Sequence, residues 1–338
     1  MRIIIVGFGT VGQGFVQILR DKRDDLHTRH NFQANVIGVV TRTRGMLYHP
    51  NGLNLTDLLN AAEGGNLASY PDSAGLVRDW SADDMIRRSN ADVMVEVTVS
   101  DLQKGQPATN YCLAALETYK HVIVANKGVV ALHYGQVMAA AKATQKQFRF
   151  EGTVMAGTPS ITLAREALAG TTVHSARGIL NGTTNYMLTQ MENGMSYADA
   201  LAEAQQLGYA EADPTADVGG WDAAGKALIL ANAVFGGNLT LQDLHVEGIT
   251  GITSQDIEEA MAAGECYKLI AEVTAKTGSI RPTRIPLSDP LAGVKGGTNA
   301  ITYQTDLLGN ITLIGAGAGK LQTGYAILAD LMAIYREG

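Results

Sequence analysis

The N-terminal half of the chain alternates short hydrophobic runs with stretches whose apolar residues recur at helical spacing. The helical spacing is clearest at Val11, Phe15, Ile18 and Leu19. Short runs rich in β-branched residues are typical of parallel strands that are buried on both faces. Such strands alternating with helices predict an α/β fold with a doubly wound parallel sheet. The predicted strands are Arg2–Val6, Asn35–Val40, Asp92–Thr98 and His121–Ala125.

A glycine pattern follows the first hydrophobic run. It has the form G-x-G-x-x-G and consists of Gly7, Phe8, Gly9, Thr10, Val11 and Gly12. In such a turn the first glycine permits a tight bend, the second lets a pyrophosphate approach, and the third lets helix and strand pack closely. The N-terminus of the following helix offers N–H groups to the phosphates. The pattern predicts a Rossmann-type dinucleotide site, and the alternative is a glycine turn used only for packing.

The end of the second predicted strand bears on which nicotinamide cofactor binds. An NAD site usually has Asp or Glu at this place, bonded to the ribose 2′-hydroxyl. Here the chain continues with Thr41, Arg42, Thr43 and Arg44. Guanidinium groups suit a 2′-phosphate, so the sequence favours NADP over NAD. The alternative is that the two arginines are ordinary loop cations.

Polar residues stand at the ends of the next two predicted strands. The third strand ends at Thr98, and the fourth delivers Asn126 and Lys127. Open α/β sheets bind ligands at the carboxyl ends of their strands, so we expect these residues in the cofactor and catalytic site. A solvent-facing lysine at a strand end is the alternative for Lys127.

The C-terminal half has a different pattern, which begins near residue 147. We expect a dinucleotide-binding domain of residues 1–134, completed by residues 311–338, and an α+β substrate-binding and dimerisation domain of residues 135–310. Residues 280–305 contain three prolines and a Gly-Gly pair, which indicates a turn-rich connection. A second glycine loop, which includes Gly317, precedes the last predicted helix and is expected to complete the cofactor site.

The densest group of charged residues lies between two predicted helices. Four carboxylates fall within twelve positions, at Glu211, Asp213, Asp217 and Asp222. Asp222 and Lys226 are four residues apart at the start of an apolar helix, so they lie on one face of it. Charged side chains at the start of a buried helix must either form an ion pair or serve a function, because burying a lone charge is costly. The alternative is an ordinary ion pair on a capped helix.

Composition narrows the class of protein. The 338 residues include 26 Lys+Arg and 33 Asp+Glu, a net charge of -7, which argues against nucleic-acid binding. Two cysteines, Cys112 and Cys266, are too few for a disulfide framework and fall in patterns that resemble buried helices. No membrane segment or signal peptide is expected, which predicts a cytoplasmic protein.

Taken together, the motifs resemble homoserine dehydrogenase over most of the chain. The similar segments are the glycine turn, Val124–Lys127, Glu151–Pro159, Asn181–Asn185, Glu211–Lys226 and Gly315–Gly319. The pattern E-x-D-P before D-x-x-x-K is the most specific of them. The chain departs from the family at Met155 and Thr158, where many members have Gly and Leu, and at Gln322, where Glu is common before Thr323. The last helix ends the chain, so we expect no ACT-type regulatory module and no fused aspartate kinase.

The resemblance implies reversible hydride transfer between L-homoserine and L-aspartate 4-semialdehyde, in threonine and methionine biosynthesis. It implies Lys226 as the proton-transfer group and Lys127 as its electrostatic partner, with the reverse assignment open. Glu211, Asp217 and Asp222 would hold the ammonium group of the substrate. The backbone of Gly182 and Thr183 would bind the other polar groups of the substrate.

The resemblance also places Thr323 in the cofactor site. Main-chain oxygens at Glu151, Val154, Ala156 and Thr158 would bind a monovalent cation such as Na⁺, and a homodimer is expected.

Other functions remain open at this point. A sugar-type oxidoreductase also places a lysine after this strand, but it leaves the acidic segment unexplained. An NADP-binding sensor without catalysis is a second alternative. The seven histidines form no zinc motif, so a zinc site is not expected. An aldehyde dehydrogenase that works through a thioester would need a reactive thiol, and the expected burial of both cysteines argues against that class of enzyme.

Overall fold

The computed structural model describes residues 1–337, which form two compact units. One unit contains residues 1–157 and the segment from residue 319 onward, and the other contains residues 158–318. The boundaries differ from those expected from sequence. Residues 135–157 belong to the first unit because they finish α6 (Lys127–Thr144) and add β6 (Phe148–Arg149) to its sheet, and residues 311–316 belong to the second unit as part of β12 (Gly309–Ala316).

The first unit is built on a six-stranded sheet in the order β3-β2-β1-β4-β5-β6. All neighbouring strands are parallel except β2 and β3, which are antiparallel. The four strands predicted from sequence are all present, and the third and fourth end earlier than expected. The strands other than β6 are β1 (Arg2–Val6), β2 (Asn35–Val40), β3 (Met46–Tyr48), β4 (Val93–Glu96) and β5 (His121–Val124).

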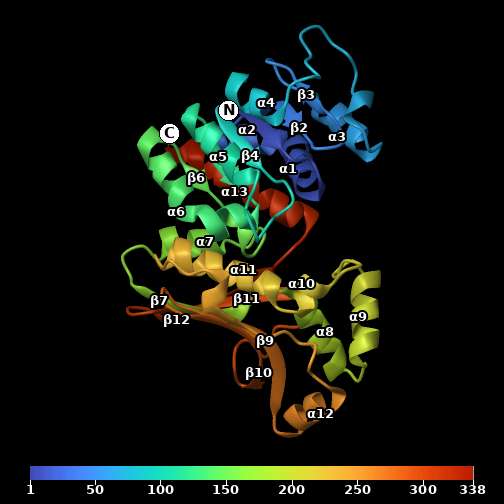
Figure 1. Ribbon diagram of the computed structural model, residues 1–338, viewed down its shortest axis with the longest axis vertical. Helices are drawn as coiled ribbons and strands as arrows, with labels where there is room; N and C mark the ends of the chain where they lie inside the picture. The colour runs from blue at the N-terminus through green and yellow to red at the C-terminus, as the bar shows by residue number, and fades with distance from the viewer. Residues whose placement is uncertain (338) are drawn as a thin grey trace. The chain divides into compact units, whose positions relative to one another are not determined.

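Helices surround this sheet (Figure 1). Besides α6 they are α1 (Thr10–Asp21), α2 (Arg23–His30), α3 (Leu55–Glu63), α4 (Ala82–Arg88), α5 (Ala108–Glu117), α13 (Lys320–Glu337) and the short turns η1 (Leu67–Ser69) and η2 (Glu151–Thr153). The last helix, α13, packs against the first, α1. The approach is close because glycines face it: a Cβ on Gly14 would lie 2.1 Å from the Lys320 oxygen, and a Cβ on Gly324 would lie 2.6 Å from the Phe15 nitrogen.

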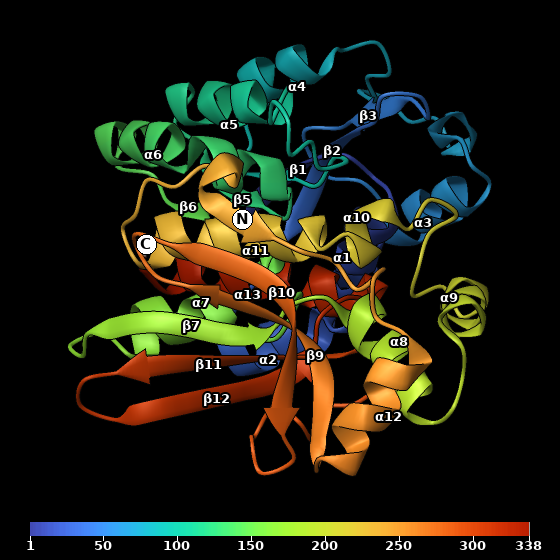
Figure 2. The ribbon, with the colours of Figure 1, turned by 60° about the horizontal axis from the view of Figure 1, so that its bottom comes forward.

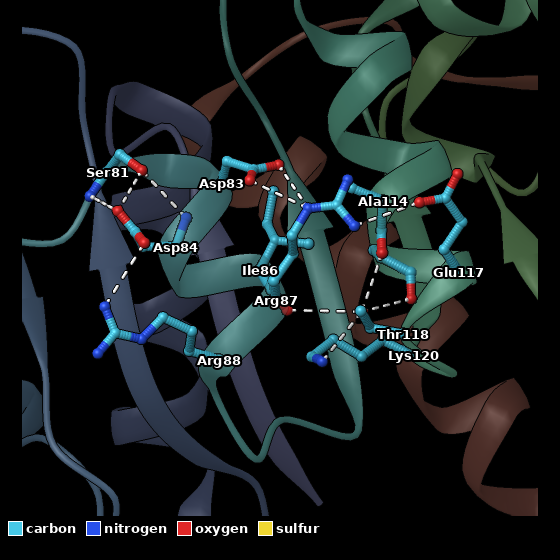
Figure 3. Close-up of polar contacts among 11 residues, drawn as sticks. Ser81, Asp83, Asp84, Ile86, Arg87, Arg88, Ala114, Glu117, Thr118 and Lys120 are labelled. Atoms are coloured by element: carbon cyan, nitrogen blue, oxygen red, sulfur yellow. Dashed lines mark hydrogen bonds and ion pairs between the residues drawn. The ribbon is translucent and has the colours of Figure 1, made fainter.

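Helix α4 shows how local sequence fixes an element of this unit. Ser81 and Asp84 form a capping box, in which each side chain accepts the other residue's backbone N–H. Arg87 forms an ion pair with Asp83 of the same helix at 3.0 Å and a second one with Glu117 of α5 at 3.3 Å (Figure 3). These exposed contacts orient α4 and α5, and they contain no catalytic arrangement.

The second unit contains a mixed sheet in the order β12-β11-β7-β9-β10-β8. Figure 2 shows β12, β11 and β7 side by side. The prediction of a turn-rich connection over residues 280–305 was wrong, because two long strands occupy most of it. Pro282 is accommodated within β10, opposite Leu269 of β9. The strands besides β12 are β7 (Val173–Ile179), β8 (Leu244–Val246), β9 (Glu265–Val273), β10 (Gly278–Pro286) and β11 (Thr298–Thr305).

Helices and turns complete the second unit. They are α7 (Ser160–Thr162), η3 (Leu163–Ala167), α8 (Gly182–Glu192), α9 (Tyr197–Gln206), α10 (Thr215–Val218), α11 (Trp221–Ile229), η4 (Leu230–Val234), η5 (Leu241–Asp243) and α12 (Ser254–Ala262). Helix α11 is buried over most of its length, as its apolar sequence predicts. In residues 1–337, no helix has both the length and the hydrophobicity needed to span a membrane.

Candidate active site

The glycine turn after β1 has the geometry that a dinucleotide requires. Gly7 has φ +94°, and a Cβ there would lie 2.7 Å from the carbonyl of Val97. A Cβ on Gly12 would lie 2.9 Å from the Gly7 oxygen, so this glycine allows close packing. A Cβ on Gly9 would meet nothing within 4 Å, which leaves room for a ligand against the backbone. The three positions therefore fit the bend, the packing and the pyrophosphate approach expected of this motif.

The residues between these glycines place a helix N-terminus at the same site. Thr10 is exposed and opens α1, Phe8 is buried, and Val11 is half-buried. No side chain of residues 1–337 caps the first turn of α1, and that turn contains no acidic residue. Its N–H groups and positive dipole end are thus available to an anionic ligand.

The loop after β2 carries the two arginines predicted to select NADP. The Thr41 hydroxyl accepts the N–H of Arg44 at 2.8 Å and donates to the Gly45 oxygen at 2.9 Å, which fixes a tight turn. Arg42 and Arg44 are exposed on this turn. No ion pair among the described residues engages either guanidinium group, so both are available to a phosphate.

A buried carboxyl group, which sequence analysis missed, lies at the end of β4. Oε1 of Glu96 accepts the N–H of Thr98 at 3.0 Å and also the hydroxyl of Thr98. Asn126 donates to the Thr98 hydroxyl at 3.2 Å and to the Val99 oxygen at 3.2 Å. Burial raises the pKa of Glu96 to about 7, and the hydrogen bonds from Thr98 and Asn126 oppose that rise. Glu96 therefore holds together two residues predicted to bind the cofactor.

Lys127 opens α6 directly after this cluster. Asn126 caps the helix by accepting the N–H of Gly128 at 3.0 Å, and the Lys127 N–H is bonded to the Ser100 hydroxyl at 3.0 Å. The backbone of Lys127 is therefore fixed on both sides. This placement at the carboxyl end of β5 is the one expected from the sequence.

In the second unit, Lys226 is the centre of a buried polar cluster. Its side chain is mostly buried, and its Nζ lies 2.8 Å from Oδ2 of Asp222. The same Nζ donates to the Leu180 oxygen at 2.7 Å. The prediction that Asp222 and Lys226 share one face of α11 is confirmed by this ion pair.

Asn181 joins the same cluster to α8, a role that the sequence did not indicate. Its Nδ2 donates to Asp217 at 2.7 Å and to Asp222 at 3.0 Å. Its Oδ1 accepts the N–H of Thr184 and so caps α8. One amide thus connects α10, α11 and the N-terminus of α8.

The other residues expected to bind substrate differ in burial and in hydrogen-bond partners. Gly182 is the first residue of α8, and a Cβ there would lie 2.6 Å from the Gly297 oxygen. The buried Thr183 hydroxyl donates to the Tyr209 oxygen at 2.7 Å. Glu211 is exposed in the loop before α10, and its main-chain oxygen accepts a hydrogen bond from Nε2 of Gln205 at 3.1 Å.

The second glycine loop ends β12 and leads to α13. A Cβ on Gly317 would lie 2.1 Å from Cγ of Asn299, so only glycine fits against this amide. Thr323 is half-buried in the first turn of α13, where its N–H donates to the Gly319 oxygen at 2.9 Å. Gly317 belongs to the second unit and Thr323 to the first.

Comparison with known proteins gives the family. The sequence profile described as "Homoserine dehydrogenase" matches residues 159–332, and the one described as "Homoserine dehydrogenase, NAD binding domain" matches residues 7–151. The chain belongs to the homoserine dehydrogenase family. The resemblance noted in the sequence and the predicted α/β fold with a Rossmann-type sheet are both confirmed.

Relatives match along the whole chain. Homoserine dehydrogenase from Methanocaldococcus jannaschii is 41% identical, with 100% of this chain and 99% of the relative covered. The NAD(+)-dependent homoserine dehydrogenase of Pseudomonas canavaninivorans is 38% identical, with 99% and 96% covered. A hyperthermophilic archaeal homoserine dehydrogenase solved in complex with NADPH superposes with a TM-score of 0.85 at 28% identity, with 100% of this chain and 98% of that chain covered.

The protein is thus a homoserine dehydrogenase by family and fold. It is an NAD(P)-dependent oxidoreductase that interconverts L-homoserine and L-aspartate 4-semialdehyde. The sugar-type oxidoreductase and the cofactor-binding sensor are not favoured by these matches.

The segment expected to bind a cation runs from η2 towards α7. Glu151 is buried, and its N–H donates to Asp330 at 2.9 Å. Val154 and Ala156 are buried, and Ala156 has φ +47°, which turns the backbone sharply. Thr158 is the first residue of the second unit, where its hydroxyl donates to the Ala316 oxygen at 3.0 Å.

The cysteines and histidines of this homoserine dehydrogenase give no sign of further chemistry. Both cysteines are buried and free. The prediction of a helix was right for Cys112 and wrong for Cys266, which packs into the core of the second unit from β9. Burial raises the pKa of both thiols. Among residues 1–337, no three His, Cys, Asp or Glu side chains are grouped closely enough to hold a metal ion.

Proposed function

We propose that Lys226 transfers the proton during homoserine oxidation and aldehyde reduction, with Asp222 holding its ammonium group. The observation that supports this most is the burial of Lys226 with its Nζ at hydrogen-bonding distance from both Asp222 and the Leu180 oxygen. A buried ammonium group held in this way beside the proposed substrate-binding carboxylates is suited to general acid–base catalysis.

Each direction of the reaction gives Lys226 a defined step. Bound nicotinamide cofactor supplies the hydride to the aldehyde carbon or accepts it from the alcohol carbon. During reduction, the Lys226 ammonium donates a proton to the aldehyde oxygen and becomes neutral. During oxidation, the neutral lysine takes the hydroxyl proton. Lys127 is proposed as a positioning and electrostatic group for the same reaction. Glu211, Asp217 and Asp222 are proposed to bind the substrate ammonium, and Gly182 and Thr183 its remaining polar groups.

Replacing Lys226 by methionine tests the proton-transfer role. Methionine keeps much of the buried volume and removes the proton, so we expect kcat to fall by about 10²- to 10⁴-fold. The KM for the cofactor should change little. Lys276→Met, at an exposed position in the same unit, is the matched control and should keep full activity. Near-normal turnover by Lys226→Met would remove this mechanism.

We further propose that the cofactor is NADP, with NAD as the weaker ligand. The support is the pair of exposed guanidinium groups at Arg42 and Arg44 where an NAD site usually has a carboxylate. One relative is named as NAD(+)-dependent and one similar structure holds NADPH, so the family admits both cofactors. The double change Arg42→Ala with Arg44→Ala should raise KM for NADP at least tenfold and leave KM for NAD unchanged. Arg23→Ala in α2 is the control, and equal losses with both cofactors would contradict the proposal.

The remaining properties implied by the family resemblance are also proposals. We infer a structural monovalent cation such as Na⁺ held by main-chain oxygens at Glu151, Val154, Ala156 and Thr158, since hard ions prefer oxygen ligands. Thermal stability that rises with NaCl but not with choline chloride would support it. We also propose a cytoplasmic homodimer that serves threonine and methionine biosynthesis. Light scattering tests the dimer, and growth of a deletion strain without these amino acids tests the pathway.

A further inference from the structure

Lys268 is a buried lysine that the proposed reaction does not use. It lies on β9 and is 0% exposed. Its Nζ donates to two neutral oxygens, Oδ1 of Asn185 at 3.0 Å and the main-chain oxygen of Val294 at 2.8 Å, and no carboxylate of residues 1–337 forms an ion pair with it. Burial lowers the pKa of Lys268, because the ammonium group loses its hydration. A charge kept at this cost, where methionine would fill the same volume, indicates a task for its hydrogen bonds.

The hydrogen bond to Asn185 fixes which way that amide faces. Asn185 lies in the first turn of α8. Its Oδ1 accepts the Lys268 ammonium, and its Nδ2 donates to the main-chain oxygens of Gly296 at 2.9 Å and Thr298 at 3.0 Å. A flipped amide would bring its NH₂ group against the ammonium and its oxygen against the two carbonyl groups, so these bonds would be lost. Lys268 and Asn185 together therefore hold residues 294–298, which we call the 294–298 loop.

The 294–298 loop packs against the proposed substrate-binding residues. A Cβ on Gly182 would lie 2.6 Å from the Gly297 oxygen, and a Cβ on Gly297 would lie 2.5 Å from Cε1 of Tyr209. The Tyr209 oxygen accepts the hydroxyl of Thr183 at 2.7 Å. Because these contacts are close, a shift of the loop must also move Gly182 and Thr183.

We propose that Lys268 is a positioning residue for substrate binding, which acts through Asn185 and the 294–298 loop to place Gly182 and Thr183. The inference rests on the proposed substrate roles of these last two residues. Lys268 itself is expected to contact neither substrate nor cofactor and to transfer no proton. It therefore differs from Lys226, whose proposed role is in the reaction.

Lys268→Met keeps most of the side-chain volume and removes the donor, so it tests the effect on kinetics. We expect the KM for homoserine to rise about tenfold, because two hydrogen bonds from a charged donor are lost. Gly182 and Thr183 would bind the same polar groups in the ground state and the transition state. For that reason kcat should stay within about threefold and the KM for NADP within about twofold of the wild type.

Hydrogen exchange measures the positioning itself and does not need turnover. In Lys268→Met, backbone amides in peptides covering residues 182–186 and 291–299 should exchange faster than in the wild type. Asn232→Leu is the control for general loss of stability, since Asn232 holds a different loop through two hydrogen bonds with Leu239, both at 2.8 Å. This variant should lower the melting temperature and leave the KM for homoserine and the exchange of these peptides unchanged.

Variants of Asn185 test whether Lys268 acts through this amide. The double variant Asn185→Leu with Lys268→Met should have a KM for homoserine no higher than the larger of the two single variants, because both changes break one chain of contacts. If Lys268→Met does not fold, Asn185→Asp takes its place. Aspartate keeps an acceptor for Lys268 and removes the donor to the loop, so the same rise in KM and the same faster exchange are expected.

Several outcomes overturn the proposal. Unchanged exchange of residues 291–299 would mean that Lys268 does not hold the loop. Faster exchange with an unchanged KM for homoserine would mean that the loop does not position the substrate site. Additive effects in the double variant would mean that Lys268 does not act through Asn185. A wild type without homoserine turnover would count against the proposed function, and the exchange experiment would still decide whether Lys268 holds the loop.

Discussion

Because Glu96 is buried, we can predict how the free energy of unfolding changes with pH. Burial raises its pKa from the ordinary 4.5 to about 7. Each pKa unit corresponds to about 1.4 kcal/mol, so the ionised form is disfavoured in the folded state by about 3 kcal/mol. Below pH 4.5 the group is protonated in both folded and unfolded chains. Between 4.5 and about 7 only the unfolded chain ionises, so stability falls as pH rises and then levels off.

Glu96→Gln removes this dependence because glutamine stays neutral. Relative to this variant, the wild type should lose about 3 kcal/mol of unfolding free energy between about pH 4 and about pH 8. Urea unfolding at a series of pH values measures the difference, and contributions from all other groups cancel. Trp80 lies in the same unit, stacked on Tyr48, so its fluorescence reports on this unit when Trp221 is replaced by phenylalanine.

The Trp221→Phe parent is the control for both proteins. A difference between parent and Glu96→Gln that does not change with pH would refute the reasoning, because Glu96 would then ionise in the folded protein like an exposed carboxylate. A difference that grows in the opposite direction would mean that the hydrogen bonds from Thr98 outweigh burial.

Three further predictions follow from single positions. Gly9→Ala meets no neighbouring atom, so the melting temperature should be unchanged while KM for NADP rises at least tenfold, as kinetics would show. Gly317→Ala would collide with the buried Asn299 amide and should lower the melting temperature, so an unchanged melting temperature would contradict this. Burial lowers the pKa of Lys268, whose Nζ donates to Asn185 at 3.0 Å. Because the unfolded chain then binds more protons, the stability of the wild type relative to Lys268→Met should rise as pH approaches 10.5 in urea titrations.

The features predicted correctly from sequence depend on residues close together in the chain. The glycine turn and the pair Asp222 and Lys226 each lie within one turn or one helix, where spacing fixes geometry. The first four parallel strands were found because each is a continuous apolar run.

The features that were missed depend on distant contacts. In the sequence, Glu96 is a single polar residue in a hydrophobic strand, with no sign of a partner. Only the fold shows that it is buried in the first unit and hydrogen-bonded to Thr98. Asn299 is next to Gly182 because β11 pairs with β7, more than a hundred residues earlier. Pro282 and the nearby prolines suggested turns, yet β10 continues through them, since pairing with β9 outweighs local preference.

The return of α13 to the first unit has a consequence for how the protein is made. Four residues of this helix, Ile327, Leu328, Leu331 and Ile334, belong to the same hydrophobic core as Phe15 of α1. A ribosome releases α1 some three hundred residues before it releases α13. Part of the core of the first unit therefore stays uncovered until the second unit has been synthesised. During translation the second unit can therefore be completed before the hydrophobic core of the first unit is, although all six strands of the first sheet are synthesised earlier.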